Sequence, residues 1–247
     1  MTNTRIILAI IVLLFLVPIF LVIISGKVPL NADWQNASRI SANIAPKPEK
    51  FPDAIVQIYA ARTFSWRGWF AVHTWIATKE KNAQTYTVYQ VIGWRKFWNL
   101  SPLSIETDIP DRYWFGQKPI LLKSFSGEQA EKLIPKIAET AKAYPYKDKY
   151  TFWPGPNSNT FVAFVARSIP ELELSMPPLA IGKDYLGKNK FIAKTPSSSG
   201  FQFSLFGLFG ITISRDEGLE IDVLGLVLGV NPLKPSISLP AIGYLGF

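Results

Sequence analysis

The pattern of hydrophobic positions begins with one long apolar run near the N-terminus. Every residue from Ile6 to Ile24 is apolar, and Pro18 is the one helix-breaking residue within that run. As a helix the run would reach about 28 Å, close to the hydrocarbon thickness of a bilayer. Arg5 would suit a cleaved signal peptide, but the run is unusually long and Ile24-Ser-Gly26 is a poor cleavage site. The pattern therefore favours an uncleaved transmembrane anchor over residues 1–26.

Residues 27–52 have a different composition. Four prolines lie in this segment, with asparagines and serines between them. That composition predicts an extended linker between the anchor and a domain. Trp34 fits either a position at the bilayer interface or packing against the domain.

Beyond the linker the pattern changes to strands. Ile55–Tyr59 and Trp69–Thr78 are the first two, and both faces of the second are apolar, which predicts a central strand. Tyr86–Gly93 follows across the polar turn Lys79–Gln84, as expected for an antiparallel hairpin. A fourth strand is predicted over Pro119–Lys123.

Two helices are predicted after these strands. Ser126, with Gln129 three residues later, resembles a capping box that opens the first helix, and Pro135 should kink or split that helix. The second helix should run over Ser158–Arg167 with Asn157 as its N-cap. Its expected buried face comprises Phe161, Phe164 and Val165.

The C-terminal segment, residues 191–247, is again strand-like. Ile211–Ile213 and Leu219–Val223 flank the turn Arg215–Gly218 and predict a hairpin. A glycine- and phenylalanine-rich hairpin of this kind could dip into a membrane. Because its segments are too short to span a bilayer, we expect ordinary core packing instead.

The composition of the chain indicates which kinds of partner it could bind. The chain has 247 residues, 48% of them hydrophobic, which suffices for a sizeable core. Its formal net charge of +8 favours anionic surroundings. The lysines and arginines are scattered and no nucleic-acid motif occurs, so lipid head groups or acidic wall polymers are expected partners and nucleic acid is not.

The chain contains no cysteine and a single histidine, His73. The lack of cysteine excludes disulfides, thiolate metal sites and a cysteine nucleophile. One histidine cannot build a histidine metal cluster. We therefore expect neither a metal nor a cofactor.

The segment Trp153–Phe161, WPGPNSNTF, is the most informative for chemistry. A proline and glycine loop leads into the predicted N-cap, which places Ser158 in the first helical turn. Free N–H groups and the helix dipole favour developing oxyanions there, and many nucleophiles occupy such positions. His73 is the other reactive candidate. The plainer alternatives are a helix-starting serine and a core histidine.

Several longer strings carry a resemblance. WRGWFAVHTWIA, PDRYWFG, YPYKDKYTFWPGPNSNTFVAFVAR and PPLAIGKDYL resemble, in this order, a bacterial membrane-anchored family known only as a domain of unknown function. The likeness covers most of the chain from Ile55 onward. It implies no activity.

A more distant resemblance is to circularly permuted papain-like folds: the NlpC-type peptidases, the PPPDE isopeptidases and the lecithin:retinol acyltransferases. It implies that His73 is the general base, that Ser158 occupies the place of the cysteine nucleophile, and that Gln90 or Tyr89 orients the imidazole. Serine departs from the group's pattern. It gains little from a setting that ionises cysteine, so it needs a well-aligned base.

The sequence thus predicts an α+β fold: a transmembrane helix, then a permuted papain-like domain over residues 53–190 with an antiparallel sheet and packed helices, then a C-terminal β extension. The leading hypothesis is a single-pass envelope protein of the inner membrane, exported to the periplasm, that acts as a serine-variant amide or ester hydrolase or acyltransferase, or is a degenerate relative. The alternative is a non-catalytic module that binds envelope polymer, lipid or a membrane protein.

Overall fold

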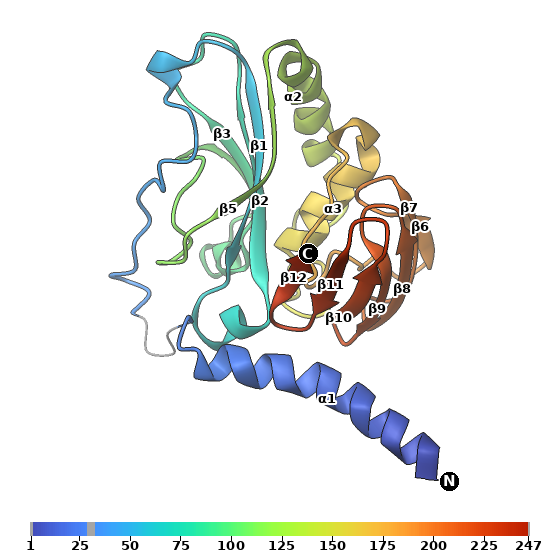
Figure 1. The fold of residues 1–247 in the computed structure, drawn as a ribbon. Coiled ribbons are helices and arrows are strands. Elements are labelled where there is room, and N and C mark those ends of the chain that lie inside the picture. Colours follow the sequence, from blue (N-terminus) through green and yellow to red (C-terminus); the bar gives the residue numbers. More distant parts are fainter. Residues whose placement is uncertain (1, 29–32, 247) are drawn as a thin grey trace.

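The computed structural model describes residues 2–28 and 33–246 as three layers, with a long helix at one end (Figure 1). The helix is α1 (Thr2–Ile24), which runs unbroken through Pro18. Among the described helices, its stretch Thr4–Ile24 is the one long and apolar enough to cross a membrane. Only 12% of its most apolar part is buried, so α1 does not behave as the core helix of a globular domain.

The first layer is an antiparallel five-stranded sheet with the order β4-β3-β2-β1-β5. Its strands are β1 (Ile55–Arg62), β2 (Val72–Lys79), β3 (Thr87–Val91), β4 (Leu103–Thr107) and β5 (Ile120–Ser126). The predicted central strand and hairpin are confirmed. However, β2 begins later than expected because Ser65–Trp69 form the 3-10 helix η2, and β4 is an edge strand that the sequence pattern did not indicate.

The middle layer contains α2 (Gly127–Lys142) and α3 (Ser158–Ser168), which pack against the first sheet (Figure 1). Helix α3 begins at the predicted residue. It lies between the two sheets and is buried over Ser158–Ala163 on all sides, not only on the predicted face. The core between this layer and the first sheet includes Ile58, Ile76, Tyr89, Ile137 and Phe161.

Helix α2 lacks the predicted capping box and is not split at Pro135. Ser126 is the N-cap residue, but its side chain makes no capping hydrogen bond. Gly127 enters the helix at φ +60°, so the chain does not approach with regular capping geometry. The helix also continues through Pro135, which lies on the exposed face. Water can there replace the hydrogen bond that the Glu131 carbonyl loses.

Part of the predicted linker, residues 27–52, packs on the domain. Asp111 is buried, and its Oδ2 accepts hydrogen bonds from the backbone N–H groups of Ile44 at 2.6 Å and Ala45 at 3.0 Å. These contacts hold that part of the segment on the domain, because a buried carboxylate needs donors. Residues 29–32 lie outside the described residues.

The third layer is an antiparallel seven-stranded sheet with consecutive strands in the order β12 to β6. Its strands are β6 (Ile192–Lys194), β7 (Gly200–Leu205), β8 (Phe209–Ser214), β9 (Gly218–Val223), β10 (Leu226–Asn231), β11 (Ser236–Leu239) and β12 (Gly243–Gly246). The predicted hairpin is β8–β9. The expectation of ordinary core packing is wrong for its outer face, where Phe201 is 61% and Ile213 is 65% exposed.

Candidate functional site

A cleft of about 1380 Å³ opens beside the first sheet and reaches the start of α3. The 3-10 helices η2 and η3 (Gly93–Trp98), the loop before β5 and the loop before α3 contribute its walls. The walls are rich in aromatic side chains: Trp34, Phe64, Trp66, Phe70, Trp94, Phe97, Trp98, Tyr113, Trp114, Phe115, Tyr150, Phe152 and Trp153. Several are exposed at the mouth, with Phe97 at 86%. Such a cleft suits a ligand with a substantial apolar part.

His73 lies on β2 and forms part of the cleft floor. Its ring stacks on Trp114 with centroids 3.6 Å apart and an interplanar angle of 8°, and Trp75 lies on the same sheet face at 5.7 Å. Nε2 is 3.1 Å from Oε1 of Gln90. Burial lowers the pKa of His73 to about 3, although the Gln90 hydrogen bond acts in the opposite direction. The imidazole is therefore neutral at neutral pH.

The strand register explains why Gln90 rather than Tyr89 contacts the imidazole. Tyr89 pairs with Ile76 across β2 and β3, and both residues belong to the main core. Side chains alternate along a strand, so His73 and Gln90 lie on the opposite face, toward the cleft. With Oε1 of Gln90 as acceptor, the proton is assigned to Nε2 of His73, which leaves Nδ1 as the basic nitrogen.

Asn157, Asn159 and Thr160 position Ser158 at the start of α3. Oδ1 of Asn157 accepts from the N–H groups of Asn159 at 3.0 Å and Thr160 at 3.1 Å, and Thr160 Oγ1 accepts in return from the Asn157 N–H. This reciprocal cap is the reason that the helix begins at Ser158. Gly182 is required beside it, because a Cβ there would lie 2.5 Å from the Asn157 amide and its φ is +98°.

Asn159 connects the start of α3 to the neighbourhood of His73. Its Nδ2 donates to the carbonyl oxygens of Val72 at 2.9 Å and Ile181 at 2.8 Å, and its Oδ1 accepts from Thr74. Both asparagines and the threonine of the Asn-Ser-Asn-Thr motif are therefore occupied in structural hydrogen bonds. Ser158 lines the cleft together with Asn157 and Asn159.

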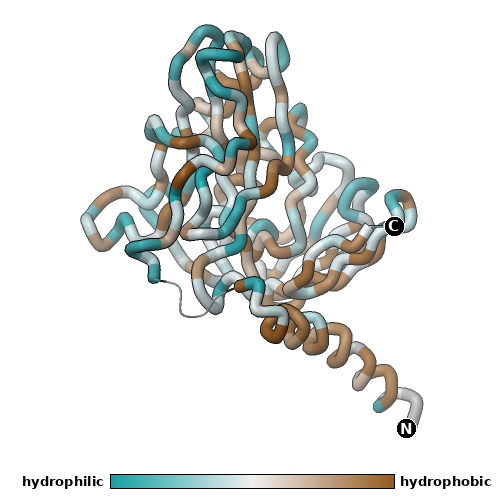
Figure 2. Tube along the Cα trace, turned by 60° about the vertical axis from the view of Figure 1, so that its left-hand side comes forward, coloured by the Kyte–Doolittle hydropathy of each residue, from teal (hydrophilic) through white to brown (hydrophobic). Residues whose placement is uncertain are grey.

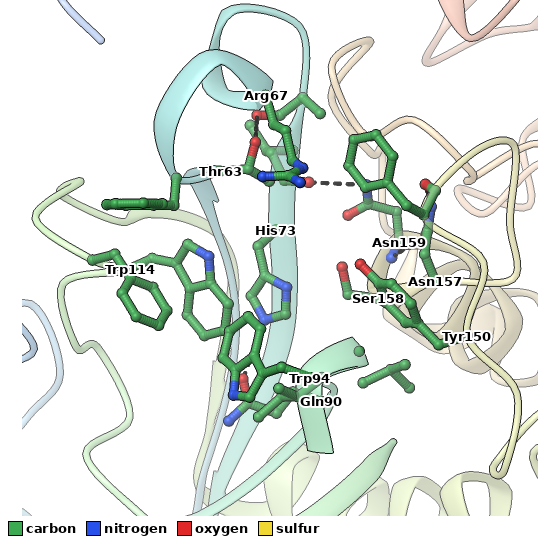
Figure 3. Close-up of a pocket in the computed structure, with 18 of the residues that line it drawn as sticks. Thr63, Arg67, His73, Gln90, Trp94, Trp114, Tyr150, Asn157, Ser158 and Asn159 are labelled. Atoms are coloured by element: carbon green, nitrogen blue, oxygen red, sulfur yellow. Dashed lines mark hydrogen bonds between the residues drawn. The ribbon is translucent and has the colours of Figure 1, made fainter. Parts of the chain in front are cut away.

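The structure brings the three sequence-predicted residues into one cleft. Figure 3 shows the Ser158 side chain across from the His73 ring, with Gln90 at the far edge of that ring and Trp114 stacked against it. No hydrogen bond joins Ser158 to His73 among the described residues. Ser158 and His73 thus line the same mostly aromatic cleft without a direct hydrogen bond between them.

Charged residues on the cleft rim were not among the site residues predicted from the sequence. Arg112 forms an ion pair with Asp108, and Glu106 accepts from Arg95 at 2.7 Å. Arg67 lies over the rings of two rim aromatics. No spacing distinguishes these residues from ordinary surface charges, so only the fold could have found them. Within the described parts of the chain, no cluster of three His, Cys, Asp or Glu side chains could hold a metal.

Comparison with known proteins identifies the family. A protein-family model described as "Protein of unknown function (DUF3750)" matches residues 53–185, the part of the chain that contributes His73, Gln90 and Ser158. Neither the curated proteins nor the solved structures contain a match. Because the family match covers more than half of the 247 residues, the chain belongs to the DUF3750 family of unknown function.

Proposed function

We propose that this protein is a membrane-anchored acyl-transfer enzyme, an ester or amide hydrolase or an acyltransferase, whose nucleophile is Ser158. The observation that supports this most is the convergence of Ser158, His73 and Gln90, from a helix start and two strands, on one cleft. In the proposal the domain has the permuted papain-like arrangement, with a serine in place of the cysteine. Each neighbour of Ser158 in its motif has a structural task, which leaves the serine for chemistry.

In the proposed reaction Ser158 Oγ attacks the acyl carbonyl carbon, and its proton passes to Nδ1 of His73. The imidazolium then protonates the departing alcohol or amine, and an acyl-enzyme remains. Water or an acceptor alcohol releases the acyl group, with His73 again taking the proton. The N–H of Ser158 is the donor left at this helix end, because Asn157 already binds the next two N–H groups.

Gln90 has a limited role in this proposal. A neutral amide at 3.1 Å can fix the tautomer and orientation of His73. It stabilises the imidazolium less than a carboxylate would, and burial already makes His73 a weak base. We therefore expect slow acylation of Ser158 compared with an enzyme that has a complete serine triad.

A fluorophosphonate probe tests the proposal, because it traps a serine whose hydroxyl is activated. Full-length protein in detergent should acquire the probe on the peptide that contains Ser158, and Ser158→Ala should abolish this labelling. Ser168→Ala is the matched control, since Ser168 lies at the opposite end of α3 and donates to the Phe164 carbonyl. Labelling that is absent, or that survives Ser158→Ala, contradicts the catalytic proposal.

The second candidate is a non-catalytic module that binds an amphipathic ligand. The neutral His73 stacked on Trp114 and the aromatic mouth of the cleft favour it. A fatty amphiphile with brominated chains should then quench tryptophan fluorescence to saturation, and Ser158→Ala should leave that binding intact. Saturable binding without fluorophosphonate labelling would favour this candidate over the enzyme.

The proposal also includes an envelope location, with the domain on the periplasmic side of the inner membrane and lipid, wall polymer or another envelope protein as partner. The apolar α1 and the net charge of +8 support it. Because the chain has no cysteine, a Lys132→Cys variant carries a unique label on an exposed face of α2. A membrane-impermeant maleimide should label it in bacterial cells with a permeable outer membrane but an intact inner membrane. Labelling that requires disruption of the inner membrane would refute this orientation.

A further inference from the structure

The C-terminal sheet carries its apolar side chains on the face that points away from the domain. The cross-strand register places them in continuous rows. One row contains Lys194, Phe201, Ile213, Leu219, Val230, Ile237 and Leu245, one from each strand, and a second contains Leu205, Phe209, Val223 and Leu226. Ile192, Phe203, Ile211, Ile221 and Leu228 lie between them. Lys194 is the only charged residue among these positions, which we call the outer face.

The opposite face of the sheet is polar and buried against α3 and the segment after it. Arg167 of α3 donates to Gln202 on β7, and Lys183 lies 3.3 Å from Glu220 on β9. Glu220 also accepts from Ser238 of β11 at 2.9 Å. These bonds fix the register, because a slip of one residue would turn every one of these polar groups outward. The polar contacts on the inner face therefore keep the apolar side chains on the outer face, away from the domain.

The outer face is too apolar to be an ordinary solvent-exposed surface. Leu219 and Val230, which neighbour each other in the first row, are about half exposed, at 48% and 51%, and the more exposed Ile213 pairs with Leu219. Contiguous apolar patches that span many strands are uncommon on soluble monomers and mark sites where a partner or a membrane binds. A sheet with one apolar face normally buries that face.

The position of helix α1 indicates what covers the outer face. It contacts β10 and β11, and its Pro18 is buried. Figure 2 shows the hydrophobic stretches of the C-terminal sheet directly above the hydrophobic helix. The chain just after α1 is packed against η2. Val28 lies so close to Gly68 of η2 that a Cβ on Gly68 would be 2.9 Å from Val28 Cγ1. A helix held this closely cannot cross a bilayer while the sheet remains far from the lipid.

We propose that the outer face of the C-terminal sheet is a membrane-docking surface that inserts into the leaflet where α1 ends. The occupant is the acyl chains and interfacial region of the bilayer that α1 crosses, so the inference rests on the membrane anchor in the proposed function but not on its chemistry. Apolar side chains gain free energy when the bilayer covers them. The protein would then be held by one helix and one sheet.

Docking in this way would also place the cleft at the membrane surface. Leu224 and Leu226, at the β9–β10 turn, line the cleft, and the indole of Trp153 donates to the Leu224 carbonyl at 2.9 Å. The outer face and the cleft mouth are thus continuous through this turn. A lipid-like ligand could enter the cleft without crossing water.

Single-cysteine labelling of the full chain tests the docking surface. Ile213→Cys carries the environment-sensitive fluorophore NBD on the outer face, and Arg215→Cys carries it in the exposed turn of the same hairpin. Lys132→Cys on α2 is the control far from the sheet. After reconstitution in vesicles of phosphatidylcholine and phosphatidylglycerol, position 213 should be quenched several-fold more by lipids with nitroxide-labelled acyl chains than position 132, and less by aqueous iodide.

NBD at position 215 should lie at the membrane interface, so its quenching by the nitroxide lipids and by iodide should be intermediate between the values at positions 213 and 132. Equal iodide quenching at positions 213 and 132 would refute the proposal. Protection from iodide without quenching by the lipid nitroxides would also overturn it, because this result would indicate that a second protein copy covers the face. The wild-type and labelled chains should give the same circular dichroism spectrum.

Discussion

The replacement Gln90→Glu tests whether the fold suppresses the basicity of His73 as the structure indicates. In the wild type, burial lowers the pKa of His73 to about 3, and the neutral Gln90 offers only a hydrogen bond. The variant places a carboxylate where the amide oxygen lies, 3.1 Å from Nε2. Glutamate and glutamine have almost the same shape, so the change is essentially one of charge.

The expected effect follows from Coulomb's law. Two unit charges about 4 Å apart interact by about 4 kcal/mol at an effective dielectric constant of about 20. At about 1.4 kcal/mol for each pKa unit, this should raise the pKa of His73 from about 3 to about 6. The cost of burying the carboxylate reduces the net gain in stability, but the pKa of the imidazole should still rise steeply.

The assay is NMR titration of the imidazole, which needs no assignment because His73 is the only histidine in the chain. The wild-type ring should remain neutral down to about pH 4, while Gln90→Glu should titrate near pH 6. Gln90→Met is the control that removes the hydrogen bond without adding charge, and its pKa should stay low. A wild-type ring that titrates near pH 6.5 would refute the reasoning, because it would mean that His73 is solvated.

The lowered pKa of His73 also makes the stability of the fold depend on pH. The folded protein binds fewer protons at His73 than the unfolded chain does between about pH 3 and the ordinary value of 6.5. Stability contributed by the neutral ring is therefore present above pH 6.5 and is lost as the pH falls toward 3. In Gln90→Glu this loss should be much smaller, which chemical denaturation at pH 7 and pH 5 can measure.

Three further predictions concern the helix start and the buried charges. Ser158→Cys should react with iodoacetamide at pH 7 about tenfold faster than Ser168→Cys, because the two thiols lie at opposite ends of the α3 dipole; equal rates would argue against an activating site. Asn159→Ala should lower the free energy of unfolding by about 1–3 kcal/mol, since it removes the side-chain donor to the Val72 carbonyl while the Ile181 carbonyl keeps the Asn157 amide, and denaturant melts would show it. Burial and the charge of Asp184 raise the pKa of Asp222 to about 8, so the folded state holds a proton that the unfolded chain releases above about pH 4. Stability should fall as the pH rises from about 4 to about 8, and Asp222→Asn should remove this fall; a melting temperature with the same pH dependence in both proteins would contradict the assignment.

Local patterns predicted the parts of the fold that local physics determines. The apolar faces of β2, the polar turn before β3 and the cap at Asn157 all depend on residues that are neighbours in the chain. Each was visible in the sequence because alternation, turn chemistry and capping act over a few residues. The short edge strand β4 was not visible, since it has little burial to impose a pattern on its residues.

The candidate site was only partly accessible from the sequence. The order of the motifs along the chain indicated His73 and Ser158 as candidate site residues. The choice between Gln90 and Tyr89 depended on the β2–β3 register. Docking of residues 44 and 45 onto Asp111 joins parts of the chain that are more than sixty residues apart. The low pKa of His73 likewise depends on burial and on Trp114, which comes from a distant loop. Such non-local contacts leave no periodic signal.

The C-terminal sheet shows most clearly where the sequence pattern misled. Alternation correctly separates Phe201, Phe203 and Leu205 from Gln202 and Ser204, yet alternation alone does not say which face is buried. In water the apolar face should be buried, and core packing was expected because the segments are too short to span a bilayer. Here Arg167 and Lys183 provide partners for the polar face inside the protein, so the apolar face is left outside. The same pattern is consistent with a stable fold once the medium beyond that face is lipid instead of water, because each face then meets an environment of its own polarity.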